Sequence, residues 1–470
     1  MARIHYLLFF LALSTTSCAD MLADILGRGK ARKSTNVTFE EIRWLQLEDP
    51  NCVVTGTSVP LSSVTAHLWN GSAIQEVSIP LKGIVNSDGS FGSANVEGSI
   101  LGVEAAQTCT VSSTMDVDCK SVSTGKEGGS GGLKICRSNG KYSRVSIEGM
   151  ALTAHSLLEE SFGFYDALVG RKDGLTKAFI LAQLKMRKDY SLPDGRKRTL
   201  FESDNAGYLG ASDDETHVLF HLYPASTVEF AKSGVNLWEV PFVMRHEFSH
   251  HVFDHYTGGG MALHGFTKSV RHGSKPHSIL PTGHRRPAGL QLTEDSKSQM
   301  ALDGINEAFA DIYAYFQGDG SSTALNGVSC LTSSRDPGSS LTKGGRVKGL
   351  TALAVSTYEG ATPAAEASDC YEPVFDGEHD IAVALGYPLA QFIKAANAGG
   401  DGKSHSRVLL AWASRIDSLL TTNISPISLD TLVRELILAL KTDLAKDVTG
   451  ACPALKAQIT GLPLATAACQ

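Results

Sequence analysis

The 470-residue chain has no run of 18 or more apolar residues, the length that a transmembrane helix needs. It also has no Cys-x-x-Cys pair, which argues against a cysteine metal site. Positive charge is not in excess, because 42 lysines and arginines stand against 49 acidic residues, and the formal net charge of −7 gives no reason to expect a nucleic-acid partner. What the chain does have is 42% hydrophobic residues, enough for buried cores in two or three domains.

The N-terminus carries a short apolar run at residues 6–13, preceded by Arg3 and followed by small polar residues. This pattern predicts a secretory signal over residues 1–17. The sequence LSTTSC, ending at Cys18, resembles a degenerate bacterial lipoprotein signal. The resemblance implies a lipidated Cys18 and a membrane-anchored protein in the periplasm or at the cell surface; cleavage nearby without lipid, giving a secreted protein, is the alternative. Residues 18–44 are expected to form a flexible linker.

Cysteine usage agrees with export. Nine cysteines minus Cys18 leave eight, an even number that indicates up to four disulfides. Sequence proximity favours three pairs and leaves a fourth, with the connectivity open: Cys109–Cys119, Cys330–Cys370, Cys452–Cys469 and Cys52–Cys136.

Residues 45–146 are rich in valine, serine, threonine and glycine. Residues 64–69 alternate in polarity, Asn70 and Gly71 form a hairpin-turn signal, and residues 73–79 return as a strand. Further turn signals at residues 86–89 and 125–132 recur at the spacing of a small sandwich. We therefore expect an all-β accessory domain over residues 45–146.

From residue 147 to 470 the pattern becomes mixed, and we expect one α+β domain. Residues 175–186 predict an amphipathic helix, and residues 204–208 and 217–223 predict strands. Leucine, isoleucine and valine recur at helical spacing over residues 381–396, 408–420 and 429–444, which predicts core helices.

The most informative stretch is WEVPFVMRHEFSHHVFDHY, residues 238–256. Residues four apart on a helix project from nearly the same line, so His246 and His250 can share one metal ion, and two imidazoles at this spacing suit zinc. Glu247 lies about 100° around the helix, well placed to contact a water on that metal as a general base. A solvated histidine-rich helix is the alternative.

A catalytic zinc takes three protein ligands, so a third must come from elsewhere. Glu307 and Asp311 are four apart in a predicted helix over residues 304–313 and face the same way. Glu307 would bind zinc, and Asp311 would accept the N–H of a zinc-binding histidine. An amphipathic helix with ordinary surface acids is the alternative.

At these residues the chain resembles the thermolysin-like gluzincins, metallopeptidases in which HExxH is followed by a helix bearing GxxNExxxD. The matched residues are His246, Glu247, His250, Gly304, Asn306, Glu307 and Asp311. The resemblance implies a zinc helix between a β-containing lobe and a helical lobe, with Asn306 supporting His250 and Asp311 supporting His246. The spacing departs from the family, because His250 and Glu307 are 307 − 250 = 57 positions apart instead of about twenty. This predicts an insertion within residues 258–302, which is either a cationic lid beside the site or a solvated loop.

Shorter resemblances to the same family concern substrate binding. Asn205 and Ala206 resemble the edge-strand segment that pairs with substrate backbone, a plain turn being the alternative. His379, oriented by Asp376, resembles the histidine that donates to the oxyanion, a surface histidine being the alternative. Arg335 resembles the arginine that binds a substrate carbonyl.

The predicted function is zinc-dependent endopeptidase activity on peptide or protein substrates. Glu247 would take a proton from a zinc-bound water and pass it to the leaving amine, while His379, with Tyr256 as a second candidate, holds the oxyanion. A zinc exopeptidase is one alternative. The other is a non-enzymatic zinc lipoprotein acting through its β-domain, but a structural zinc closes with four protein ligands and has no use for Glu247.

Overall fold

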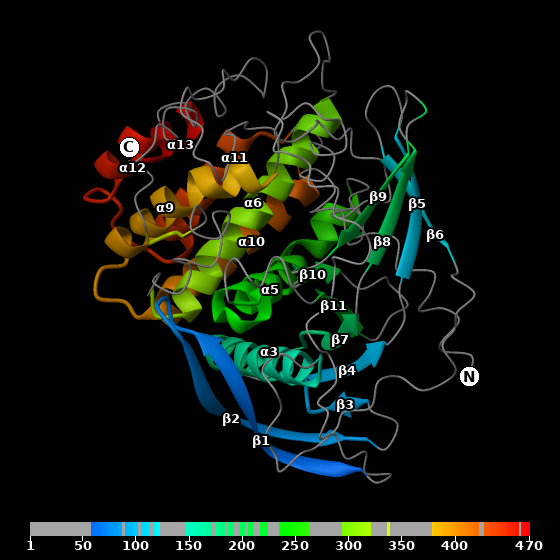
Figure 1. The fold of residues 1–470 in the computed structure, drawn as a ribbon. Helices are drawn as coiled ribbons and strands as arrows, with labels where there is room; N and C mark the ends of the chain where they lie inside the picture. The colour runs from blue at the N-terminus through cyan, green and yellow to red at the C-terminus, as the bar shows by residue number, and fades with distance from the viewer. Residues whose placement is uncertain are drawn as a thin grey trace.

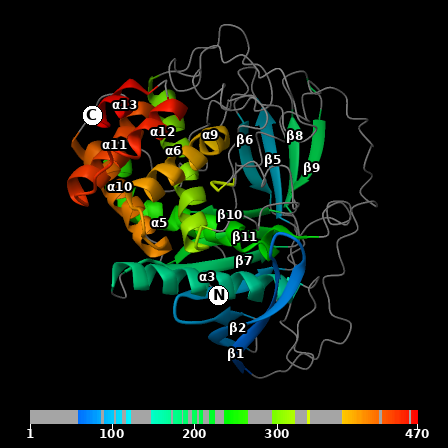
Figure 2. The same cartoon turned by 90° about the vertical axis from the view of Figure 1, so that its left-hand side faces the viewer.

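The fold is taken from a computed structural model, viewed in Figures 1 and 2. It describes residues 58–86, 90–101, 105–111, 117–122, 147–170, 174–183, 186–191, 195, 197–202, 205–209, 217–223, 235–263, 294–320, 336–338, 378–422, 427–459 and 462–470. Strands occupy the N-terminal half of this part of the chain, and helices dominate the C-terminal half, so the fold is α+β as expected.

Within the described residues, the larger sheet is mixed and has seven strands in the order β1-β2-β3-β4-β7-β11-β10. Its strands are Val59–Trp69 (β1), Ile74–Val85 (β2), Phe91–Gly92 (β3), Val96–Leu101 (β4), Lys177–Gln183 (β7), Asn205–Leu209 (β10) and His217–Tyr223 (β11). The β1–β2 hairpin is confirmed, with Trp69 opposite Ile74 and the Asn70 side chain accepting from the backbone N–H groups of Ser72 and Ala73. Strand β11 has the predicted bounds.

A smaller sheet has the order β6-β5-β8-β9, from strands Ala105–Val111 (β5), Val117–Val122 (β6), Met186–Ser191 (β8) and Lys197–Glu202 (β9). Strand β4 pairs in parallel with β7, and β5 pairs in parallel with β8. Strands from either side of residue 146 therefore share both sheets, and those of residues 59–122 do not form a sandwich of their own. The register also places Cys109 directly opposite Cys119.

One predicted helix is wrong. Residues 177–183, KAFILAQ, form strand β7 between β4 and β11, where both neighbours run parallel to it. A seven-residue apolar run fits either state on local pattern alone, and here pairing with distant strands decides it.

The long helix Ile147–Val169 (α3) lies between the larger sheet and the helices, as Figures 1 and 2 show. Two of its polar side chains tie it to the turn between β3 and β4. The Glu159 carboxylate accepts from the Asn95 backbone and amide N–H groups, both at 2.9 Å, and from the Ser93 hydroxyl. His155 Nε2 lies 2.6 Å from Ser93 Oγ. His155 is fully buried, and this burial, opposed by the nearby Glu159 charge, lowers its pKa to about 4.

The helical half is built around three helices that pack on one another: Pro241–Leu263 (α5), Glu294–Gln317 (α6) and Gly402–Thr422 (α10). Helix Glu378–Ala396 (α9) covers α6, and Leu429–Leu438 (α11), with the π-helical turn Ala439–Asp443 (η4), packs on α10. The predicted helices over 381–396, 408–420 and 429–444 are thus confirmed. Helix α6 approaches α9 at Gly304, where a Cβ would lie 2.4 Å from Ile381 Cδ1.

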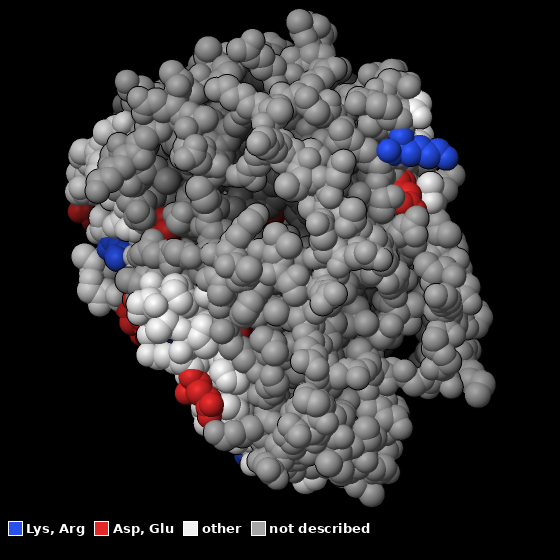
Figure 3. All heavy atoms as spheres, viewed as in Figure 1, with Lys and Arg blue, Asp and Glu red and all other residues white. Residues whose placement is uncertain are grey.

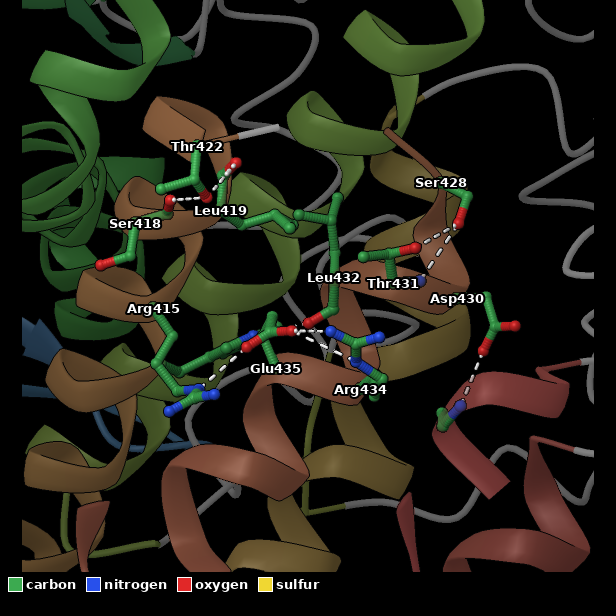
Figure 4. A network of polar contacts seen from close by, with 12 residues as sticks. Arg415, Ser418, Leu419, Thr422, Ser428, Asp430, Thr431, Leu432, Arg434 and Glu435 are labelled. Carbon is green, nitrogen blue, oxygen red and sulfur yellow. Dashed lines mark hydrogen bonds and ion pairs between the residues drawn. The ribbon is translucent and has the colours of Figure 1, made fainter. Parts of the chain in front are cut away.

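A polar network joins α10 and α11, seen close up in Figure 4. The buried Glu435 carboxylate accepts from Arg415 at 2.8 Å and from Arg434 at 2.7 Å. Arg415 reaches on to the exposed Asp443 at 2.9 Å. Burying a carboxylate requires such compensation, and the two arginines supply it for Glu435.

The chain ends in two short helices, Cys452–Gln458 (α12) and Pro463–Ala468 (α13). The predicted Cys452–Cys469 disulfide is confirmed. Asp430 of α11 accepts from the Leu464 and Ala465 N–H groups, which fixes the start of α13. Disulfides are typical of proteins in oxidising compartments. Among the described residues, none of the helices is both long and apolar enough to span a membrane.

Candidate metal centre

Helix α5 carries HEFSH through the centre of the molecule. Its apolar residues Met244, Phe248, Val252 and Phe253 have no exposed surface, and the helix contacts α3, α6, α10 and β10. It begins with Pro241, which suits a first helical turn because its missing N–H would have no helical partner. The helix ends at Leu263, so the three glycines at 258–260 lie inside it.

His246 and His250 face each other as their spacing predicts. Both are buried, their rings lie edge to face with centroids 4.5 Å apart, and their Nε2 atoms are 2.9 Å apart. One ligand atom from each of His246, Glu247 and His250 falls within 4.8 Å of the others. These three residues form a largely buried, metal-capable group on a helix next to the mixed sheet.

Helix α6 brings Glu307 to the same point. Its two carboxylate oxygens lie 3.3 Å from His246 Nε2 and 3.5 Å from His250 Nε2, and the residue is buried. Ligand atoms about 2.1 Å from a tetrahedral zinc are about 3.4 Å from one another. The separations between Glu307 and the two histidines match that spacing, while the 2.9 Å between the two nitrogens is shorter.

Two further α6 side chains contact the outer nitrogens of the histidines. His250 Nδ1 lies 3.0 Å from the Asn306 side-chain oxygen, and His246 Nδ1 lies 2.9 Å from an Asp311 oxygen. A carboxylate or amide oxygen accepts, so each Nδ1 donates, and each Nε2 then presents its lone pair toward Glu307. These are the contacts that the family resemblance implies for Asn306 and Asp311.

Glu247 is partly buried and is held from the sheet side. Its Oε2 accepts from the backbone N–H of Tyr208 at 2.9 Å. Tyr208 belongs to β10, which is an edge strand of the larger sheet within the described part of the chain. The sheet thus contacts the candidate general base directly, through main chain.

Two residues at this contact, Tyr208 and Asp254, were not predicted from the sequence. The Tyr208 hydroxyl donates to Asp254 Oδ2 at 2.9 Å, and the Tyr208 ring stacks on those of His250 and His251. Asp254 follows His246 and His250 at the same four-residue interval along α5. That spacing could have indicated from the sequence that Asp254 lies on the same face of the helix as the two histidines. Nothing in the sequence indicated that Tyr208 is its partner.

The substrate-binding predictions meet the structure only in part. Asn205 and Ala206 lie in β10, which pairs antiparallel with β11, so they are in a strand and not a plain turn. Ala206 is buried. Arg335 and Asp376 lie outside the described residues, and so do the side chains of Asn205 and of His379 at the start of α9. Cys18, Cys52, Cys136, Cys330 and Cys370 are also outside them, as are residues 264–293 of the expected insertion.

Tyr256, the second candidate for the oxyanion donor, lies close to two other tyrosines. Its hydroxyl lies 3.4 Å from that of Tyr165 on α3, and both are close enough to Tyr313 to act on it electrostatically. Burial, and then these two neighbours, raise the pKa of Tyr313 well above its usual value. Tyr256 belongs to this cluster of tyrosines, and its role as an oxyanion donor stays a prediction.

No protein-family model matches the chain, and no curated protein matches its sequence. Any functional assignment therefore rests on the residues themselves.

The surface has an open hollow and, on one face, scattered charged groups. The described residues form an open hollow of about 620 Å³ over β2, β3 and β4, and none of the residues discussed above as candidate ligands or catalytic groups lines it. Described basic and acidic side chains on the face in Figure 3 appear as separate groups of mixed sign.

Proposed function

We propose that this protein is a zinc-dependent peptidase that uses His246, His250 and Glu307 as metal ligands and Glu247 as general base. The observation that carries the proposal is the convergence of two imidazole nitrogens and one carboxylate, with Glu247 beside them. Three ligands with an acid next to the open position is the arrangement of catalytic zinc sites, whereas structural sites close with four ligands.

The chemistry of the donor set fits zinc. Two neutral imidazoles and a carboxylate suit Zn²⁺ better than Ca²⁺ or Mg²⁺, which prefer oxygen ligands. Asn306 and Asp311 favour the histidine tautomers in which each Nε2 atom carries a lone pair that can bind a metal ion. Two lone pairs and a carboxylate directed at one buried point repel one another, and a cation between them removes that repulsion.

When bound, zinc would supply Lewis-acid chemistry, polarising the scissile carbonyl and acidifying water. The Glu247 carboxylate would accept a proton from the attacking water and return it to the leaving amine. Strand β10 is an edge strand of the sheet within the described residues and lies beside α5. It would bind an extended peptide through its main-chain groups at Asn205 and Ala206. His379 stays a candidate for the oxyanion donor.

The test is digestion of casein and of a peptide library by the purified full chain, with and without a chelator. Glu247→Gln should retain the metal and lose nearly all turnover, because an amide cannot accept the proton. Glu160→Gln is a matched control, since Glu160 is a partly exposed acid on α3 whose described partner is Arg245. Hydrolysis that survives in Glu247→Gln at the wild-type rate would refute the proposal.

Metal analysis separates the enzyme from a structural zinc protein. Wild type should hold one zinc per chain, and Glu307→Ala should bind it more weakly because two histidines leave the ion under-coordinated. Stoichiometric zinc together with no hydrolysis of any peptide or protein would favour the non-enzymatic alternative. Release of single terminal residues only would favour an exopeptidase.

A further inference from the structure

The mechanism proposed above makes no use of Asp254, a buried acid on the zinc helix. Asp254 lies one helical turn beyond His250 on α5, and its side chain faces β10. Burying a carboxylate is costly unless it is hydrogen-bonded, and the partner that the Asp254 Oδ2 atom has here is the Tyr208 hydroxyl, at 2.9 Å. The acid therefore has a structural connection to the same residue whose backbone holds Glu247.

Tyr208 makes contacts with α5 through three of its parts. The backbone N–H donates to Glu247 Oε2, the ring lies near-parallel to that of His250 at 6.2 Å, and the hydroxyl donates to Asp254. These α5 contacts span 254 − 247 = 7 positions, which is about two helical turns. Fixing the ring and hydroxyl against the helix leaves the Tyr208 amide little freedom to move away from Glu247.

We propose that Asp254 and Tyr208 form a clamp that positions the general base. The Asp254–Tyr208 hydrogen bond holds strand β10 on α5, and β10 in turn holds one Glu247 oxygen through the Tyr208 amide, so that the carboxylate is oriented before substrate arrives. Asp254 and the Tyr208 side chain are positioning residues, because they act through Glu247. This inference rests on the proposed peptidase function for its kinetic consequence, but the clamp itself is a property of the folded chain.

The kinetic test compares Tyr208→Phe, Asp254→Ala and Asp254→Asn with wild type. Tyr208→Phe keeps the ring and removes only the hydroxyl, while Asp254→Asn keeps an oxygen that can accept. Tyr208→Phe and Asp254→Ala should lower kcat about tenfold to a hundredfold with KM changed less than about threefold, since small misplacement of a catalytic group has effects of this size. Asp254→Asn should retain most of the wild-type kcat, because the asparagine oxygen still accepts the hydrogen bond. If a negative charge at position 254 were what mattered, Asp254→Asn would lose as much kcat as Asp254→Ala.

Tyr315→Phe is the matched control. Tyr315 is as buried as Tyr208, at 3% exposed, and its hydroxyl also has one described side-chain partner, Lys394 at 3.2 Å. Its kinetics should equal those of wild type. Zinc affinity should stay within about threefold of wild type in all four variants, because none of them removes a proposed ligand.

A second readout needs neither zinc nor turnover. The Tyr208 amide should exchange slowly with deuterium in metal-free wild type, and Tyr208→Phe and Asp254→Ala should raise its exchange rate about tenfold or more, while Tyr315→Phe leaves it unchanged. Unchanged exchange at residue 208 in both clamp variants would overturn the inference, and so would a loss confined to KM. If wild type shows no hydrolysis that Glu247→Gln abolishes, the proposed function fails, and the exchange measurement still decides whether the clamp exists.

Discussion

Replacing Gly304 by alanine should destabilise the protein, although alanine is the better helix former. An ideal Cβ at position 304 of α6 would lie 2.4 Å from Cδ1, 2.6 Å from Cβ and 2.7 Å from Cγ2 of Ile381, which is fully buried on α9. Rotating the Ile381 side chain cannot relieve the contact with its Cβ, because that atom is fixed to the backbone. One of the two helices must therefore move.

The magnitude follows from two opposing effects. Glycine to alanine inside a helix gains about 0.5–1 kcal/mol. Overpacking a filled core costs about 1–3 kcal/mol, and an overlap that involves backbone-fixed atoms belongs at the upper end of that range. We therefore expect Gly304→Ala to lose about 2 kcal/mol. Gly163→Ala on α3 is the matched control: no atom lies within 4 Å of its Cβ, so it should gain about 0.5–1 kcal/mol.

Urea unfolding of the two variants beside wild type measures the difference. The midpoint should fall for Gly304→Ala and rise for Gly163→Ala, at unchanged slope. If both substitutions raise the midpoint equally, α9 does not approach α6 at Gly304 as closely as the structure has it.

Three further outcomes test other contacts. Burial lowers the pKa of His155 from 6.5 to about 4, so His155 is protonated in the unfolded chain at a higher pH than in the folded one. The contribution of His155 to stability should be complete above pH 6.5, and the free energy of unfolding should fall by about 3 kcal/mol as the pH drops to 4. His155→Gln should remove this loss in urea titrations. Glu435→Ala should cost about 3 kcal/mol and Asp443→Ala under about 1 kcal/mol, because their side chains are 6% and 37% exposed while sharing one arginine; equal costs would contradict this. The Cys452–Cys469 disulfide closes a loop of 17 residues, so removing it by Cys452→Ser should lower the free energy of unfolding by about 3 kcal/mol. An unchanged melting temperature in this variant would contradict that expectation.

The local features of the fold were predictable from the sequence. The β1–β2 hairpin follows from Asn70-Gly71 between alternating runs, and α10 and α11 follow from apolar residues at helical spacing. HEFSH could be placed on a helix for the same reason, and the facing of His246 and His250 then needs only the helical repeat. Each of these depends on residues close together in the chain.

The features that could not be predicted from the sequence depend on residues far apart in the chain. Strand β7 looked helical because its sequence shows no sign of β4, which lies some 80 positions earlier in the chain and pairs with it in parallel. That pairing also joins residues 59–122 to the chain beyond residue 147, which no local composition shift could indicate. Tyr208 was missed for the same reason, since its contacts with Glu247 and Asp254 cross from sheet to helix.

The GxxNExxxD segment combines two physical demands that mutagenesis can separate. Gly304 has no side chain, which allows α9 to pack closely on α6. In contrast, Asn306, Glu307 and Asp311 contact the histidines of α5. If the approach of α9 sets where α6 lies, Gly304→Ala should weaken zinc binding as well as lower stability, because it moves all three polar side chains together. Glu307→Ala should weaken zinc binding without a comparable loss of stability in the metal-free protein, since it relieves a repulsion among converging donors. Zinc affinity unaffected by Gly304→Ala, alongside a clear loss of stability, would show that α6 keeps its place on α5 independently of α9.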